Sequence, residues 1–191
     1  MRTPLIPFIL LVGSLAACTG QSTVKPVETL DEQTGVTVGA LKNPIELVMK
    51  SQSVALVSSK RPNFAYLGPV EWNRSGVFSY SLWIHVSPGN ERQPGDIRAP
   101  DALTMILDDG PLVLSPSEAP KLARDPYTPA VAWGQTAYFE LTTETLKRMA
   151  ASQKLELNVR AADGSTLSFT PSIDARAALK EYLRDRGITG D

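Results

Sequence analysis

The chain has 191 residues, with 19 Lys and Arg against 20 Asp and Glu, and its formal net charge is −1. This balance gives no electrostatic reason to expect nucleic acid or an anionic membrane surface as a partner. A single cysteine excludes a disulfide within the chain, but a domain of about 150 residues can bury a sufficient core without one.

The N-terminus has the form of a secretory signal peptide. Arg2 is the only charged side chain before Lys25, and every residue from Leu5 to Val12 except Pro7 is large and hydrophobic. A basic start, a short apolar core and small residues near the cleavage point are typical of such signals. The apolar stretch is shorter than the roughly 20 residues that span a bilayer. We therefore expect residues 1–17 to be removed.

The end of this segment, Leu15-Ala16-Ala17-Cys18, resembles the lipobox of bacterial lipoproteins. The resemblance covers the first eighteen residues. It implies that Cys18 carries a thioether-linked diacylglyceryl group, becomes the first residue after cleavage and is often acylated on its amine. Two or more acyl chains form a stable membrane anchor, whereas one chain binds reversibly. The alternative is an ordinary secretory signal in which Cys18 lies near the cleavage point by chance.

The resemblance also bears on location and partners. An Asp after the lipidated Cys commonly retains lipoproteins of enteric bacteria in the inner membrane, and this chain has Thr19 there. We therefore expect the periplasmic face of the outer membrane in a Gram-negative cell, or the cell membrane in a Gram-positive one. The body, with "DEQTGVTV" and "LKRMAASQKLELNVR", resembles small proteobacterial lipoproteins of unknown function. The expected partners are the membrane, through the anchor, and an envelope protein or polymer, but not nucleic acid.

Residues 18–34 are predicted to be the acylated Cys18 and a polar tether. The segment 19–34 is mostly polar, contains Pro26 and has few hydrophobic residues. If extended, it reaches on the order of 50 Å. We expect residues 35–191 to form a single globular domain.

Period-2 alternation and β-branched or aromatic residues dominate from residue 36 to 142, which predicts strands. Asp109-Gly110 and Asp163-Gly164 are typical two-residue hairpin turns, in which both residues take positive φ. The proline-rich stretches 88–100 and 116–129 are expected to be loops. The predicted strands are 36–41, 45–50, 53–59, 63–73, 76–87, 103–108, 111–116, 136–142, 154–161 and 165–171.

Two short helices are predicted in the C-terminal third. Residues 143–153 place Leu146, Met149 and Ala150 on one face, with Thr143 as the N-cap. A second helix is expected over 173–186, with Gly187 at C′ and Ile188 contacting Leu183 in a Schellman cap. The fold class predicted is therefore α+β, with a mainly antiparallel sheet built from hairpins.

One predicted hairpin carries a candidate binding face. If Arg74-Ser75 is its two-residue turn, Tyr66 lies directly opposite Trp83, and one face of the hairpin carries Tyr66, Trp72, Trp83 and His85. Exposed aromatic residues on a sheet mark partner or glycan surfaces. The alternative, which we favour, is a central hairpin that is buried on both faces.

Motifs for catalysis and metal binding are scarce. The chain has one histidine, His85, and lacks both the Gly-x-Ser-x-Gly elbow and Ser-x-x-Lys. A triad through His85 remains geometrically possible. One histidine and no free cysteine exclude the usual zinc sets. The pair Asp108-Asp109 is better explained by turn chemistry, so no catalytic residue, metal ligand or cofactor is predicted.

The function that these features favour is a non-enzymatic, lipid-anchored periplasmic module that binds an envelope protein or polymer. The alternative is a cell-wall or glycan hydrolase with two carboxylates about 5–9.5 Å apart. Convergence of any two of Glu71, Glu140, Glu156 and Asp108 in a pocket would favour that alternative. A third possibility is a lipoprotein that only stabilises a larger envelope assembly.

Overall fold

The computed structural model describes residues 25–50, 63–87, 103–129, 133–160 and 164–188. The helices are α1 (Thr143–Ala151) and α2 (Ala175–Asp185). The strands are β1 (Pro26–Asp31), β2 (Val36–Leu41), β3 (Ile45–Met49), β4 (Phe64–Arg74), β5 (Val77–Ser87), β6 (Leu103–Leu107), β7 (Gly110–Leu114), β8 (Pro116–Ser117), β9 (Gln135–Leu141), β10 (Glu156–Arg160) and β11 (Thr166–Pro171).

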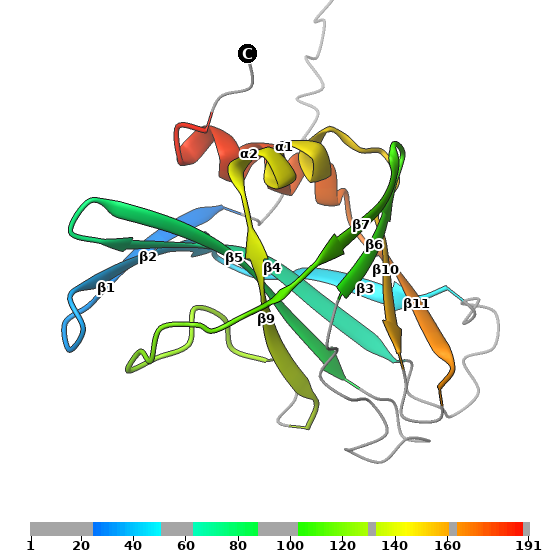
Figure 1. The fold of residues 1–191 in the computed structure, drawn as a ribbon, viewed down its shortest axis with the longest axis horizontal. Helices are drawn as coiled ribbons and strands as arrows, with labels where there is room; N and C mark the ends of the chain where they lie inside the picture. Colours follow the sequence, from blue (N-terminus) through cyan, green and yellow to red (C-terminus); the bar gives the residue numbers. More distant parts are fainter. Residues whose placement is uncertain (1–24, 51–62, 88–102, 130–132, 161–163, 189–191) are drawn as a thin grey trace, which may run out of the picture.

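The strands form one antiparallel sheet that curls into a nearly closed barrel (Figure 1). Its order is β7-β6-β10-β11-β3-β4-β5-β9-β8. The strands β7 and β8 stand at opposite ends of this order but follow one another in the chain, so they bring the two ends of the sheet together. At this junction the Glu140 N–H donates a hydrogen bond to the Ser115 carbonyl at 2.9 Å. The predicted fold class, a mainly antiparallel sheet with two short helices late in the chain, is confirmed.

The barrel interior is apolar, and the two helices lie side by side over one end of it (Figure 1). Period-2 alternation places one set of side chains from neighbouring strands on this inward face. These side chains are almost completely buried: Leu47, Ala65, Val86, Met105, Leu157 and Phe169. They form the main core of the domain.

Both helices follow the predicted pattern. Leu146, Met149 and Ala150 of α1 are buried, although the N-cap is Thr142, one residue before the expected Thr143. The second helix has Asp174 as its N-cap and begins at Ala175, two residues later than expected.

The predicted Schellman cap of α2 is present. Gly187 has a φ of 65°, and the Ile188 N–H donates to the Leu183 carbonyl at 2.9 Å. This is the backbone bond that defines the motif. The cap fixes where the chain leaves the helix and therefore where Arg186 lies.

The ladder along β4 is interrupted where β2 gives way to β3. The last pair of β2 is Ala40 with Val70, and the first pair of β3 is Ile45 with Leu67. Four residues, 41–44, therefore lie opposite only two, 68–69. Beyond this break, residues 26–41 and 70–81 form an extension that we call the arm, at the left of Figure 1.

The register of the β4–β5 hairpin differs from the prediction. Ser75 and Gly76 have φ of 53° and 87° and form the turn, so Arg74 pairs with Val77. The Gly76 N–H donates to the Asn73 side-chain oxygen at 2.9 Å, which favours this turn over Arg74-Ser75. Tyr66 therefore lies opposite His85, not Trp83. Because the register moves by two residues, the predicted faces are unchanged.

The turn of the β6–β7 hairpin also differs. Leu107 pairs with Gly110, so the turn residues are Asp108 and Asp109. Neither aspartate has positive φ, whereas Gly110 does. The Asp108 carboxylate accepts hydrogen bonds from the backbone N–H groups of residues 153 and 154, which follow α1.

The predicted strand 53–59, loop 88–100 and turn residue Asp163 lie outside the described residues. Within the expected loop 116–129, Pro116–Ser117 form β8.

The predicted tether is wrong from Pro26 onward, because Pro26–Asp31 form β1 and pair with β2. Asp31 then closes the turn: its carboxylate accepts from the N–H groups of Gln33 and Thr34, and from Ala123 at 2.7 Å. These bonds, the Ala123 bond foremost, lower the pKa of Asp31. Backbone pairing holds a segment that has few hydrophobic residues of its own.

Among the described helices, none has the length and apolar character needed to cross a membrane.

A candidate binding cleft on the arm

The candidate site is built on a row of cross-strand neighbours in the arm. Gly39 of β2 lies between Glu28 of β1 and Glu71 of β4, and Tyr80 of β5 continues the row. Adjacent strands are about 4.8 Å apart. The two carboxylates therefore flank a position that has no side chain.

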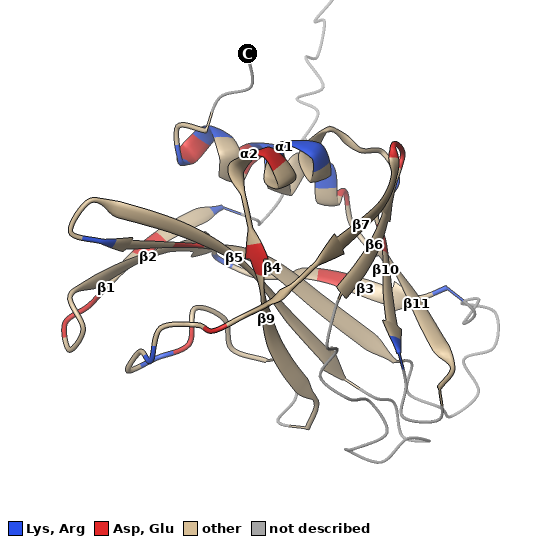
Figure 2. Ribbon diagram, viewed as in Figure 1, with Lys and Arg blue, Asp and Glu red and all other residues tan. Residues whose placement is uncertain are grey.

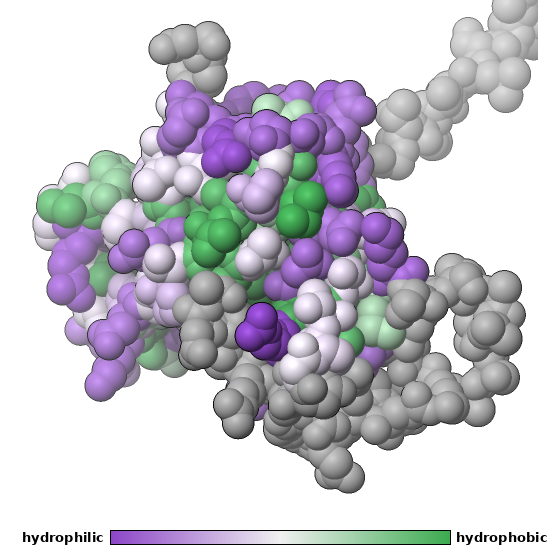
Figure 3. All heavy atoms as spheres, turned by 45° about the vertical axis from the view of Figure 1, so that its right-hand side comes forward, coloured by the Kyte–Doolittle hydropathy of each residue, from purple (hydrophilic) through white to green (hydrophobic). Residues whose placement is uncertain are grey.

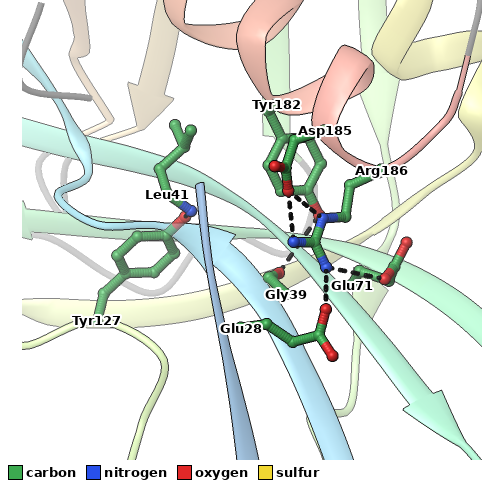
Figure 4. A network of polar contacts seen from close by, with 8 residues as sticks. All are labelled: Glu28, Gly39, Leu41, Glu71, Tyr127, Tyr182, Asp185 and Arg186. Carbon is green, nitrogen blue, oxygen red and sulfur yellow. Dashed lines mark hydrogen bonds and ion pairs between the residues drawn. The ribbon is translucent and has the colours of Figure 1, made fainter. Parts of the chain in front are cut away.

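The guanidinium of Arg186 occupies the space above Gly39 (Figure 4). A Cβ atom added to Gly39 would lie 2.4 Å from Nη1 of Arg186. Arg186 follows directly after α2, and the Tyr182 hydroxyl of that helix donates to the Gly39 carbonyl at 3.3 Å. The absence of a side chain at Gly39 thus lets the end of α2 approach the sheet.

Arg186 is the centre of a charged cluster formed with Glu28, Glu71 and Asp185. Nη1 donates to Glu28 at 3.1 Å and to Glu71 at 3.4 Å, while Nε donates to Asp185 at 3.1 Å. The Arg186 side chain is only 8% exposed. One cation faces three carboxylates, so the charged cluster has a net charge of −2.

The charged cluster changes the titration of its neighbours. Burial acts to lower the pKa of Arg186, but the carboxylates of Asp185 and Glu71 outweigh it, and the pKa lies above its ordinary value. Burial, together with the nearby Glu71, raises the pKa of Tyr80 to about 12. Arg186 and Tyr80 therefore keep their protons at any physiological pH.

A cleft of about 640 Å³ opens beside the charged cluster. Its floor is the inward face of the arm, and its wall is the end of α2 with residues 185–188. The floor residues are Glu28, Thr37, Glu71, Asn73, Phe78 and Tyr80. Charged, polar and aromatic groups thus meet in one concave surface.

Large hydrophobic side chains are exposed around this floor. The next cross-strand row runs from Leu30 through Thr37 and Asn73 to Phe78. Leu30 is 59% exposed and Phe78 is 54% exposed. Hydrophobic atoms gather at the arm's outer end, on the left of Figure 3. Figure 2 shows acidic residues in the adjoining β1–β2 hairpin. Exposed apolar groups that gather on one surface are typical of interaction sites.

The aromatic face predicted from the hairpin lies elsewhere, on the outward side of β4 and β5. Trp72, Trp83 and His85 are buried there, and Tyr66 is partly buried. The Tyr127 ring packs on Trp83 with centroids 5.0 Å apart. The buried alternative therefore describes Trp72, Trp83 and His85.

His85 is enclosed in this second apolar layer. Its Nδ1 lies 2.9 Å from the Thr136 hydroxyl, and its Nε2 has no hydrogen-bond partner in the described part of the chain. A Cβ on Gly134 would lie 2.4 Å from Nε2, so the backbone passes close above the ring. Burial lowers the pKa of His85. Its position on the outward face separates it from the cleft.

The four carboxylates proposed for a hydrolase do not gather in the cleft, because Glu71 is the only one of the four among its lining residues. Glu140 pairs with Ser81, which places it on the opposite face of the sheet from Glu71. Glu156 forms an ion pair with Lys50 at 2.9 Å. Asp108 bonds to the backbone after α1.

Sequence reasoning missed Glu28, Asp185 and Arg186. Gly39 was the available signal, since a glycine inside a strand often marks close approach by another group.

Within the described residues, no group of three or more His, Cys, Asp and Glu side chains is arranged to hold a metal ion. Comparison with models of protein families, with curated proteins and with solved structures finds no significant match.

Proposed function

We propose that this chain is a lipid-anchored interaction module of the bacterial envelope, which acts by binding and not by catalysis. In a Gram-negative cell it would lie on the periplasmic face of the outer membrane. The lipobox-like residues ending at Cys18 support the anchor. The observation that carries the binding role is the cleft on the arm, with exposed Leu30 and Phe78 on the same face.

The chemistry of the cleft supports binding better than hydrolysis. A glycosidase needs one protonated carboxyl group and a second, free carboxylate across the substrate. Here Glu28, Glu71 and Asp185 all bond to the guanidinium of Arg186. The three carboxylates therefore converge on one shared cation, an arrangement unlike two carboxyl groups that face each other across a substrate.

The short spacer also supports a role close to the membrane. Seven residues, 19–25, separate Cys18 from β1. Fully extended, they span about 25 Å. An anchored domain would thus hold its arm within reach of other proteins on the same membrane.

Site-specific photocrosslinking in cells tests this proposal. The photoreactive residue benzoylphenylalanine is placed at Phe78 in the full-length, anchored chain, and at the exposed Glu144 of α1 as the control. We expect a discrete crosslinked product from position 78 that position 144 does not give. Identical products from both positions, or none from position 78, would contradict a binding role for the arm.

The anchor is tested separately. Cys18→Ser should abolish labelling with palmitate and leave either uncleaved precursor or soluble protein. Normal labelling of this variant would show that Cys18 is not the site of lipidation.

A further inference from the structure

The strand β1 has one paired edge and one free edge. It pairs with β2 over all six residues, and no other strand in the described part of the chain pairs with it. Residues 27–30 are exposed. A free edge presents unpaired backbone N–H and C=O groups to a further strand. No proline lies between Val27 and Asp31 to block such pairing.

The side chains beside this edge set the chemistry of an added strand. Glu28 and Leu30 lie on the inward face, because Glu28 pairs with Gly39 and Leu30 with Thr37 of the cleft floor. Both side chains are 59% exposed. A strand added to β1 would place its own side chains directly beside them.

The charge of the edge favours a basic partner. Residues 26–34 contain Glu28, Asp31 and Glu32 but no Lys or Arg. Asp31 is engaged in its turn, whereas Glu28 belongs to the charged cluster of net charge −2. A second copy of β1 would bring acidic residues against acidic residues, which is unfavourable across strands.

We propose that β1 accepts an extended segment of a partner protein as an additional strand. The segment carries a Lys or Arg beside Glu28 and an apolar side chain beside Leu30, two positions away on the same face. Backbone hydrogen bonds supply affinity, and these two side chains supply selectivity, as in other cases of strand addition. This inference rests on the proposed function, since it specifies the partner of the same arm.

Short peptides test the inference on the full-length, lipidated chain in a neutral detergent. The probe is a capped, fluorescently labelled hexapeptide of threonine with lysine at position 2 and valine at position 4, so that lysine and valine lie on the same face of a strand. One control peptide has glutamate in place of lysine, and another has N-methyl groups on its backbone amides, so that it cannot donate hydrogen bonds to a strand. We expect the basic peptide alone to raise the fluorescence anisotropy. Hydrogen exchange should show added protection of the backbone amides that face the free edge of β1, within residues 27–31.

Protein variants locate the contact. Glu28→Gln and Leu30→Ser should each weaken binding about two- to five-fold, the range expected for one cross-strand pair. Glu118→Gln and Val113→Ser, exposed changes outside the arm, are the matched controls and should leave binding unchanged.

Three results would overturn strand addition: equal binding of the acidic or N-methylated peptide, protection only outside β1, or no binding at millimolar concentration. If Phe78 still gives its specific crosslink, the interaction module stands and only the strand addition fails. If that crosslink is also absent, the proposed function fails as well.

Discussion

The hydroxyl of Tyr127 accepts a hydrogen bond from the backbone N–H of Leu41 at 3.0 Å. The same hydroxyl donates to the Pro69 carbonyl at 2.8 Å. Both backbone groups lie at the break where β2 gives way to β3 along β4. A Cβ on Gly68 would lie 2.3 Å from the Tyr127 ring, so the glycine makes room for it. The Tyr127 side chain thus supplies the hydrogen bonds that β2 and β4 do not make with each other at the break, and it holds the base of the arm in place.

Tyr127→Phe should therefore destabilise the domain by about 2–3 kcal/mol, since it leaves a buried donor and a buried acceptor unpaired. Chemical denaturation measures the free energy of unfolding. Tyr66→Phe, at a partly buried tyrosine on the outward face, is the control and should cost no more than about 0.5 kcal/mol. Equal effects of the two changes would show that the Tyr127 hydroxyl does not support the sheet.

Gly39→Ala tests the seat of Arg186. The new methyl group would lie 2.4 Å from Nη1, so either the guanidinium or the strand must move. We expect a loss of about 1–3 kcal/mol in the free energy of unfolding, as for other overpacked sites.

A double-mutant cycle gives the control for Gly39. In an Arg186→Ala background the clash is gone, so Gly39→Ala should cost at least about 1 kcal/mol less than in the wild type. Additive effects would mean that Gly39 and Arg186 do not interact. The single change Arg186→Ala leaves Glu71 buried without its cation, and should cost about 2–3 kcal/mol. This is below the roughly 3–5 kcal/mol of a fully enclosed pair, because the cleft is open to solvent.

Removal of β1 tests the corrected domain boundary. A chain that begins at residue 35 lacks both the β1 pairing and the Asp31 bond to Ala123. Its free energy of unfolding should fall by more than about 2 kcal/mol, since buried backbone groups of β2 lose their partners. A chain that begins at residue 19 keeps β1 and should retain the stability of the mature protein. Equal stability of the two chains would restore the view of residues 26–34 as a tether.

Local features of this fold could be predicted from the sequence. The Schellman cap depends on Gly187 and on contacts within a few residues, so the pattern alone places it. The apolar face of α1 follows from its period in the same way. The β4–β5 faces were also predictable, because a register error of two residues leaves them unchanged. The turn itself was not, because turns at 74–75 and at 75–76 give the same faces, and the hydrophobic pattern does not choose between them. The local bond between Asn73 and Gly76 makes that choice.

The charged cluster could not be predicted, because its members are far apart in the sequence. Arg186 and Glu28 are separated by 158 positions and meet only through the sheet order and the end of α2. The strand β1 was missed for a related reason. Its stability comes from pairing with β2 and from Asp31, and not from hydrophobic residues within the segment.

The pH dependence of stability tests the buried state of His85, which is the only histidine in the chain. Burial lowers its pKa in the folded protein below the usual 6.5, whereas the unfolded chain keeps that usual value. As the pH falls below about 6.5, the unfolded chain therefore binds more protons, and the free energy of unfolding decreases. The slope cannot exceed about 1.4 kcal/mol per pH unit for a single proton. The loss stops once the pH is below the pKa of the folded state. His85→Gln should remove this slope between pH 7 and about pH 5, while any lower-pH loss caused by carboxyl groups should remain. Urea denaturation of both proteins across this range measures the difference. Parallel curves for the wild type and the variant would mean that His85 is not held neutral in the fold.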